Sequence, residues 1–193
     1  MMRTGVFAAV AAVAAIGLTA CDPVRDPRGA ATDPADASAP AATSNIVLQP
    51  KGLGVRDAAG ATTTVAFGAA KLDALAALAA AHDGTPGVQS ANGDCGAGPL
   101  TFAGWDDGLT VAFDGGEFAG WSIGNAGPAT EGGIGVGSSR AALQALSPAV
   151  DNSTLGTEFT ATIPGGDLGG LLDGPTPEAR VTTLWAGVTC MFR

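Results

Sequence analysis

The stretch LTVAFDGGEFAGWSI, residues 109–123, decides the fold expected for this chain. Apolar and polar side chains alternate along Leu109–Phe113, and a period of two residues is typical of a half-buried β-strand. Asp114-Gly115-Gly116 has the composition of a tight turn, after which Glu117–Ile123 runs back as a second strand. This is the strongest hairpin signal in the sequence, so we expect an antiparallel sheet in the folded region.

A helix is predicted before this hairpin, over Ala69–His82. Four apolar residues recur there at helical spacing and predict one apolar stripe: Leu72, Leu75, Leu78 and Ala79. Gly84 and Pro86 end the helix, and the Gly- and Asn-rich residues up to Gly98 are expected to form a loop. Three further strands are expected in this part of the chain: Ile46–Leu48, Thr62–Phe67 and Leu100–Ala103.

The second part of the chain repeats this order of elements. Ser138 is the expected N-cap of a short helix, Ser139–Leu146, which ends at Pro148. A turn is expected at Asp173-Gly174-Pro175. Three strand candidates follow the helix: Leu155–Ile163, Leu168–Leu172 and Arg180–Met191.

These two parts predict a duplicated unit. Gly52-Leu53-Gly54-Val55 and Gly133-Ile134-Gly135-Val136 are alike, and in each part a helix precedes antiparallel strands. We therefore expect an α+β fold in a single domain, residues 45–193, built from units of about 45–127 and 132–193 with both helices on one face of a shared sheet. This architecture is similar to the tandem units of β-lactamase-inhibitor-like proteins and of small outer-membrane assembly lipoproteins.

The N-terminal residues 1–20 have the layout of a secretory signal peptide. Arg3 supplies a positive charge, and the apolar run Val6–Leu18 is shorter than the ~20 residues that a membrane-spanning helix needs. Leu18-Thr19-Ala20-Cys21 matches a lipobox, so we predict cleavage before Cys21 and lipidation of its thiol. The alternative is an ordinary secretory signal followed by a chance cysteine.

Residues 21–44 are expected to be the lipidated cysteine and a disordered tether, because Pro, Ala, Asp, Thr and Ser dominate and no hydrophobic periodicity is present. The predicted location is the cell envelope, facing the periplasm, with the lipid anchor in the inner or the outer membrane. Asp22 directly after the cysteine resembles an inner-membrane retention signal.

The charge balance narrows the range of partners. The chain has 18 acidic and 9 basic residues, with a formal net charge of −9. No basic patch is present, so nucleic acid is not an expected partner. The membrane is an expected partner, and the protein contacts it through the lipid anchor on Cys21.

Cys95 and Cys190 are predicted to form a disulfide, because two thiols in an exported domain usually pair. A catalytic thiol at Cys95 and two unpaired buried thiols remain as alternatives. A nucleophilic cysteine needs a base, and the only histidine is His82, at the end of a predicted helix.

Other motifs predict no catalytic, cofactor-binding or metal site. His82-Asp83 is half of a metal site at most, and the carboxylate pairs Asp106-Asp107 and Asp114–Glu117 match no calcium loop. The glycine-rich run at 133–138 is not a GxGxxG fingerprint and is not followed by a parallel βαβ pattern. No cofactor is therefore expected.

Trp185 is the candidate residue for contact with a partner. By alternation, one apolar face of the last strand holds Leu184, Ala186, Val188 and Cys190. Trp185 then points to the opposite face. It either covers a neighbouring glycine or is an exposed aromatic anchor for a partner.

Several phrases across the folded region resemble small alphaproteobacterial lipoproteins, some of which are labelled aspartate-semialdehyde dehydrogenase. The phrases are residues 95–99, 108–110, 118–121, 153–159, 172–175 and 184–187. The resemblance implies an envelope lipoprotein. The labelled enzyme has a Rossmann domain, a Cys/His pair and a chain nearly twice this long, and this sequence lacks that fingerprint.

We therefore expect a non-catalytic cell-envelope lipoprotein that binds a protein partner or supports envelope assembly. The alternative is an enzyme, either the dehydrogenase of that label or a hydrolase that uses a carboxylate pair.

The lipobox gives the first prediction. Cys21→Ser removes the only thiol that can carry the acyl chains, so it should abolish labelling by an alkyne fatty acid and release the protein from the membrane fraction. Cys95→Ser is the matched control and should keep the label. Unchanged labelling of Cys21→Ser would rule out the lipoprotein assignment.

Overall fold

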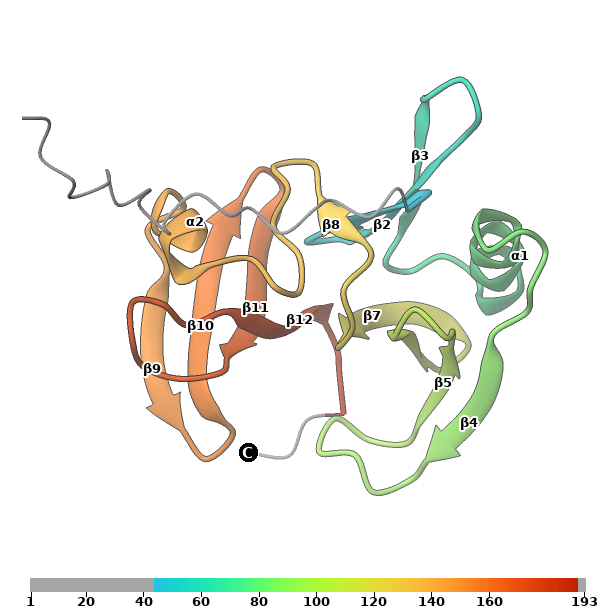
Figure 1. Ribbon diagram of the computed structural model, residues 1–193. Helices are drawn as coiled ribbons and strands as arrows, with labels where there is room; N and C mark the ends of the chain where they lie inside the picture. The colour runs from blue at the N-terminus through green and yellow to red at the C-terminus, as the bar shows by residue number, and fades with distance from the viewer. Residues whose placement is uncertain (1–43, 191–193) are drawn as a thin grey trace, which may run out of the picture. The chain divides into compact units, whose positions relative to one another are not determined.

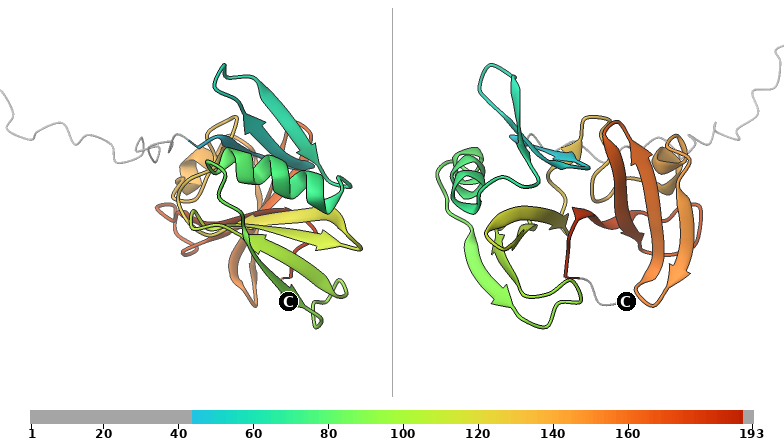
Figure 2. Two further views of the ribbon diagram at one scale, coloured as in Figure 1. Left: turned by 90° about the vertical axis from the view of Figure 1, so that its right-hand side faces the viewer. Right: turned by 180° about the vertical axis from the view of Figure 1, so that it is seen from behind.

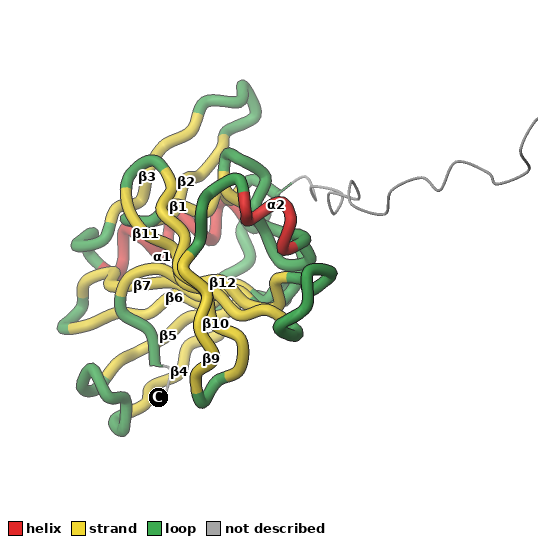
Figure 3. Tube along the Cα trace, turned by 90° about the vertical axis from the view of Figure 1, so that its left-hand side faces the viewer, coloured by secondary structure: helices red, strands yellow, loops and turns green. Residues whose placement is uncertain are grey.

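A computed structural model describes residues 44–190 of the chain. Residues 1–43 and 191–193 lie outside this part, and with them the predicted signal peptide, Cys21 and nearly all of the predicted tether. The described part is a β-rich α+β fold with two helices, one of them short (Figure 1). Figure 3 shows how far strands predominate over helices.

An eight-stranded antiparallel sheet forms the larger layer, in the order β4-β5-β6-β7-β12-β11-β10-β9. The predicted hairpin of residues 109–123 is confirmed as β6–β7, next to the pairing of β7 with β12 in the middle of the sheet. The strands are β4 (Val88–Asn92), β5 (Leu100–Gly104), β6 (Leu109–Asp114), β7 (Glu117–Ile123), β9 (Ala149–Ser153), β10 (Gly156–Ile163), β11 (Gly166–Leu172) and β12 (Val181–Gly187).

A smaller mixed sheet has the order β3-β2-β1-β8. Its strands are β1 (Ile46–Gln49), β2 (Gly52–Arg56), β3 (Thr62–Ala66) and β8 (Ala129–Thr130), of which β1 and β8 run parallel. The loop expected between the first helix and Gly98 is partly wrong, because Val88–Asn92 forms β4. This strand is exposed along most of its length, so it lacks the apolar alternation that would have identified it.

Helix α1 (Lys71–Ala81) contacts β2 and β7 through Ala74 and Leu78, which are fully buried. The predicted apolar stripe is wrong in one member, since Leu72 is 81% exposed. Ala74 and Leu78 face the core, and Leu72, two residues before Ala74, lies about 200° away around the helix, on its outer side. Helix α2 (Arg140–Gln144) is shorter than expected, and its N-cap is Ser139, not Ser138. The Ser139 hydroxyl accepts a hydrogen bond from the amide of Ala142 at 3.2 Å.

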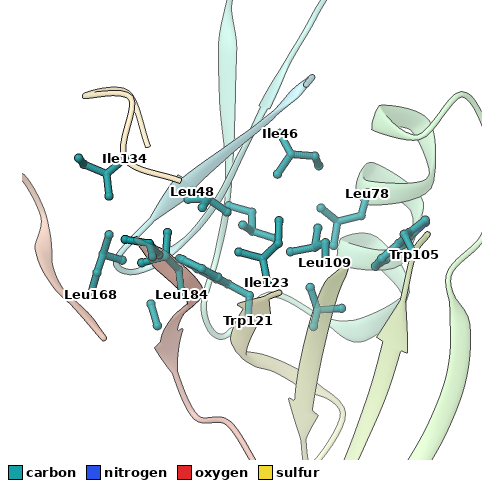
Figure 4. Packing of buried hydrophobic residues seen from close by; sticks show 14 of the residues in the cluster. Ile46, Leu48, Leu78, Trp105, Leu109, Trp121, Ile123, Ile134, Leu168 and Leu184 are labelled. Carbon is teal, nitrogen blue, oxygen red and sulfur yellow. The ribbon is translucent and has the colours of Figure 1, made fainter. Parts of the chain in front are cut away.

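The main core lies between the two sheets and the helices (Figure 4). Leu78 of α1 and Leu143 of α2 belong to this one cluster. Trp121 of β7 is fully buried at its centre, and its indole N–H donates to the carbonyl of Gln49 at 2.9 Å. This bond ties the end of β1 to the middle of the large sheet.

The predicted faces of the last strand are confirmed only as far as Gly187. Leu184 and Ala186 are buried in the main core, as expected. Gly187 then adopts a φ of 72° and ends β12, so the alternation stops. Val188 is 36% exposed, and Cys190 packs in a second cluster with Leu100 and Ala112, so the expectation that they continue the core face is wrong.

The Trp121 hydrogen bond gives the second prediction. Trp121→Phe should lower the free energy of unfolding by about 2–4 kcal/mol, because it removes the indole donor to the Gln49 carbonyl and opens a cavity. Urea unfolding followed by circular dichroism measures this loss. Phe113→Leu is the control, since it removes buried volume from the same cluster without removing a hydrogen bond. A loss for Trp121→Phe no larger than for Phe113→Leu would contradict the proposed tie.

Candidate functional site

A hollow of about 400 Å³ lies where α1 ends and β4 begins. We call it the acidic hollow, because three aspartates line it. Its lining residues are Ser44, Asn45, Ala81, His82, Asp83, Thr85, Pro86, Val88, Gly104, Trp105, Asp106 and Asp107. The hollow therefore brings the start of the folded region, the end of α1 and the β5–β6 turn together.

His82 is fixed on both ring nitrogens at the edge of the acidic hollow. Its Nδ1 lies 2.7 Å from the carbonyl of Leu78, and its Nε2 lies 3.1 Å from Oδ2 of Asp107. The imidazole stacks on Trp105, with ring centroids 4.7 Å apart and planes inclined by 10°. Both nitrogens face acceptor oxygens, so the ring is held at both ends.

Trp105 holds the connection between α1 and β4. Its indole N–H donates to the carbonyl of Thr85 at 2.9 Å, and its ring lies so close to Gly87 that a Cβ there would meet it at 2.8 Å. With His82 on one side and Gly87 on the other, the ring is covered. The His82–Trp105–Asp107 group therefore orders the entry to β4 and offers no open aromatic face to a ligand.

The acidic hollow carries little of what a catalytic or metal site needs. Asp107 is engaged twice, since its Oδ1 also accepts the amide of Leu109 at 3.0 Å. Within residues 44–190, no group of three His, Cys, Asp or Glu side chains is placed to hold a metal ion. Among these residues, the His82-Asp83 pair gains no further metal ligands from the fold.

The two carboxylate pairs considered for a hydrolase do not converge. Asp106 and Asp107 lie in the turn before β6, whereas Asp114 and Glu117 face each other across the turn after it. A strand rises ~3.3 Å per residue, so the length of β6 separates the pairs by ~20 Å. The four carboxyl groups therefore do not gather in one site, and a hydrolase that uses either pair alone stays an untested alternative.

The glycine-rich run at 133–138 uses its amides internally. The amide of Gly135 donates to the Ser138 hydroxyl at 3.0 Å, that of Ile134 to the Thr130 hydroxyl at 3.0 Å, and that of Gly137 to the Val181 carbonyl at 2.7 Å. A phosphate-binding loop points such amides at the ligand. The run is therefore a structural turn that leads into α2.

The predicted disulfide is present between Cys95 and Cys190, with their Cα atoms 5.1 Å apart. Cys95 lies between β4 and β5, and Cys190 follows β12. The side-chain amide of Asn92 donates to Sγ of Cys190 at 3.4 Å. The bond therefore joins the end of the chain to the first half of the large sheet, and the alternative of a free catalytic thiol at Cys95 is wrong in this structure.

Trp185 points away from Leu184 and Ala186, as its position in the alternation predicts. It pairs with Gly169 of β11, where a Cβ would lie 2.2 Å from the indole nitrogen. The side chain is only 8% exposed, so it fills the space above a glycine and presents little surface. These facts favour the packing interpretation, and a partner contact at Trp185 stays a prediction.

The exposed apolar surface lies elsewhere, at residues that the sequence analysis did not select. Leu72 of α1 and Val88 of β4 are 81% and 79% exposed. The left view of Figure 2 shows α1 and β4 facing the same side of the domain. We call this surface the α1–β4 face and define it by the exposed residues Leu72, Ala76 and Ala80 together with β4. The exposure of Leu72 could not be read from the sequence, because it depends on which side of an apolar helix meets the sheet.

Comparison with protein-family models, with curated proteins and with solved structures finds no match for this chain. The resemblance to alphaproteobacterial lipoproteins accordingly stays a prediction. In the part of the chain that the structure describes, no helix has the length and apolar character needed to cross a membrane.

The disulfide gives the third prediction. In mature protein carrying Cys21→Ser, iodoacetamide without reductant should modify neither remaining cysteine, as measured by intact mass. Reduction should lower the free energy of unfolding by about 4–5 kcal/mol, because the bond closes a loop of 95 residues. Modification of both thiols before reduction would contradict the pairing.

Proposed function

We propose that this chain is a non-catalytic lipoprotein of the cell envelope, anchored through Cys21, whose folded domain binds a protein partner at the α1–β4 face. The observation that carries the proposal is the exposure of Leu72 and Val88, at 81% and 79%, on two neighbouring elements. Leu72 lies in the first turn of α1, ~14 Å along the helix axis from the end that leads to β4, so the two side chains are separate apolar points on this face. Exposed apolar surface on one face of a domain is the feature that marks interaction sites.

The composition of α1 supports this proposal. A surface helix usually carries polar residues on its outer side. Here the exposed side of α1 consists of Leu72, Ala76 and Ala80 after the single charged pair Lys71 and Asp73 at its start. Alanine has the highest helix propensity, so such a helix forms without help from its outer side chains. That side is therefore available for contact with another molecule.

The disulfide supports an exported protein. Bonds of this kind persist in oxidising compartments such as the bacterial periplasm and are rare in the cytosol. The Cys95–Cys190 bond thus agrees with the predicted signal peptide and lipobox.

The strand order supports the duplicated unit. Reading the large sheet inward from either edge gives four strands in chain order, β4 to β7 and β9 to β12. Each set follows a helix, and Leu78 of α1 and Leu143 of α2 reach the same core cluster. We infer that two copies of one helix-plus-four-strand unit share the sheet, with both helices on its core face. Duplication gives the domain two comparable sides, of which only one has an apolar helix face.

Site-specific cross-linking tests the proposed function and gives the fourth prediction. A photoreactive amino acid at position 72 should yield a discrete protein adduct in intact cells, identified by mass spectrometry. The same amino acid at Thr154, an exposed residue in the β9–β10 turn, is the control and should yield none. Leu72→Glu, introduced together with a photoreactive group at position 76, should weaken the adduct and leave the melting temperature unchanged, because the side chain is exposed.

Two results would contradict the proposal. One is the absence of any adduct at positions 72 and 76. The other is an adduct of equal intensity at Thr154, because it would show contact without preference for the α1–β4 face.

A further inference from the structure

β4 is an edge strand of the large sheet, and β5 is its single neighbour. The amide of Trp105 donates to the carbonyl of Leu109, so the backbone groups of Trp105 point toward β6. In an antiparallel sheet, alternate residues bond to opposite sides, and the backbone groups of Gly104, Phe102 and Leu100 therefore point toward β4. Their partners on β4 are Val88, Ser90 and Asn92, which bond to β5. The amides and carbonyls of Gln89 and Ala91 consequently point outward, away from the sheet.

This edge lacks the features that usually prevent strand pairing. Natural edges are protected by charged side chains, prolines or bulges. The sequence of β4 is VQSAN, which contains neither charge nor proline, and Val88 at its start is 79% exposed. The opposite edge, β9, begins directly after Pro148 and carries Asp151 in its middle. The two edges of one sheet thus differ in the property that decides whether another strand can be added.

The surroundings of β4 determine the charge of a suitable partner. The acidic hollow, with Asp83, Asp106 and Asp107, lies at the first residue of β4, and Asp94 lies two residues after its last residue. A second copy of this chain has the same net charge of −9 and would be repelled. A segment with lysine or arginine at its ends would be attracted to both ends of the strand.

We propose that the edge of β4 binds an extended, basic segment of the partner protein as an added strand of the large sheet. The outward groups of Gln89 and Ala91 form the new ladder. Val88 packs against an apolar side chain of the segment, and one basic side chain enters the acidic hollow. This inference rests on the proposed function, because it describes how the same face recognises its partner.

The test uses two synthetic eight-residue peptides of alternating valine and threonine, one with lysine at both ends and one with glutamate at both ends. Fluorescence anisotropy should show that the purified protein binds the lysine peptide at least about tenfold more tightly, with an affinity that falls as salt is raised. Amide hydrogen exchange should slow at Gln89 and Ala91 when the lysine peptide is bound. This second measurement needs no variant of the protein.

A matched pair of proline variants locates the site. Ala91→Pro removes an outward amide, and edge strands accept proline where the amide faces solvent. It should weaken binding of the lysine peptide by about tenfold or more, because the amide donor at residue 91 is lost and the proline ring keeps the added strand at a distance. Asn152→Pro is the control on β9. Ile163 and Gly166 flank a two-residue turn and bond to each other, so Ile163 and every second residue before it, Thr157 included, bond to β11. Asn152 is paired with Thr157, and its amide therefore points outward from β9.

The outcomes separate this inference from the proposed function. Equal binding of both peptides, no slowing of exchange at Gln89 and Ala91, or slowing at the β3 edge instead would overturn strand addition at β4. An equal loss of binding in Asn152→Pro would also overturn it. If the adduct at position 72 persists in such a case, the α1–β4 face still binds a partner and only the mode of recognition is wrong.

Discussion

The pairing of β7 with β12 is the contact on which the rest of the structure depends. It places Leu184 opposite Ile123 and Ala186 opposite Trp121, and so joins two four-stranded halves into one sheet. Leu184 and Trp121 are both fully buried, whereas a separate half would leave them at its edge. Separating the halves would expose the apolar side chains along β7 and β12 to water, so neither half would retain this core alone.

The same strand also covers the opposite face of the sheet. After Gly187, the amide of Val188 donates to the carbonyl of Ala119 at 2.9 Å, and the chain crosses β7 so closely that a Cβ on Gly120 would lie 2.0 Å from the Val188 carbonyl oxygen. This crossing brings Cys190 beside Leu100 and Ala112, where Cys95 binds it. A glycine at position 120 is thus a condition for the disulfide, although the two are far apart in the sequence.

Much of the architecture could be predicted from local patterns, because those patterns reflect burial on one face. The β6–β7 hairpin, the first helix and the core face of Leu184 and Ala186 all follow from periodicity. β4 and β9 were missed because edge strands bury too little to leave a pattern. The site was less predictable. Whether Leu72 meets the core or the solvent depends on packing at Ala74, and no sequence period distinguishes two sides of an alanine-rich helix.

The differences between the two halves identify which features the fold does not require. Both halves complete the same sheet, yet the second does so with a short helix whose ends are Arg140 and Gln144 and with an edge that carries Asp151. An apolar outer helix face and an uncharged edge are therefore unnecessary for stability. In the first half they expose apolar surface and unpaired backbone groups to water, which costs solubility and favours unwanted pairing. A contact that covers them would explain features that are dispensable for folding and unfavourable in isolation, and this supports the proposed interaction surface on the first half of the domain.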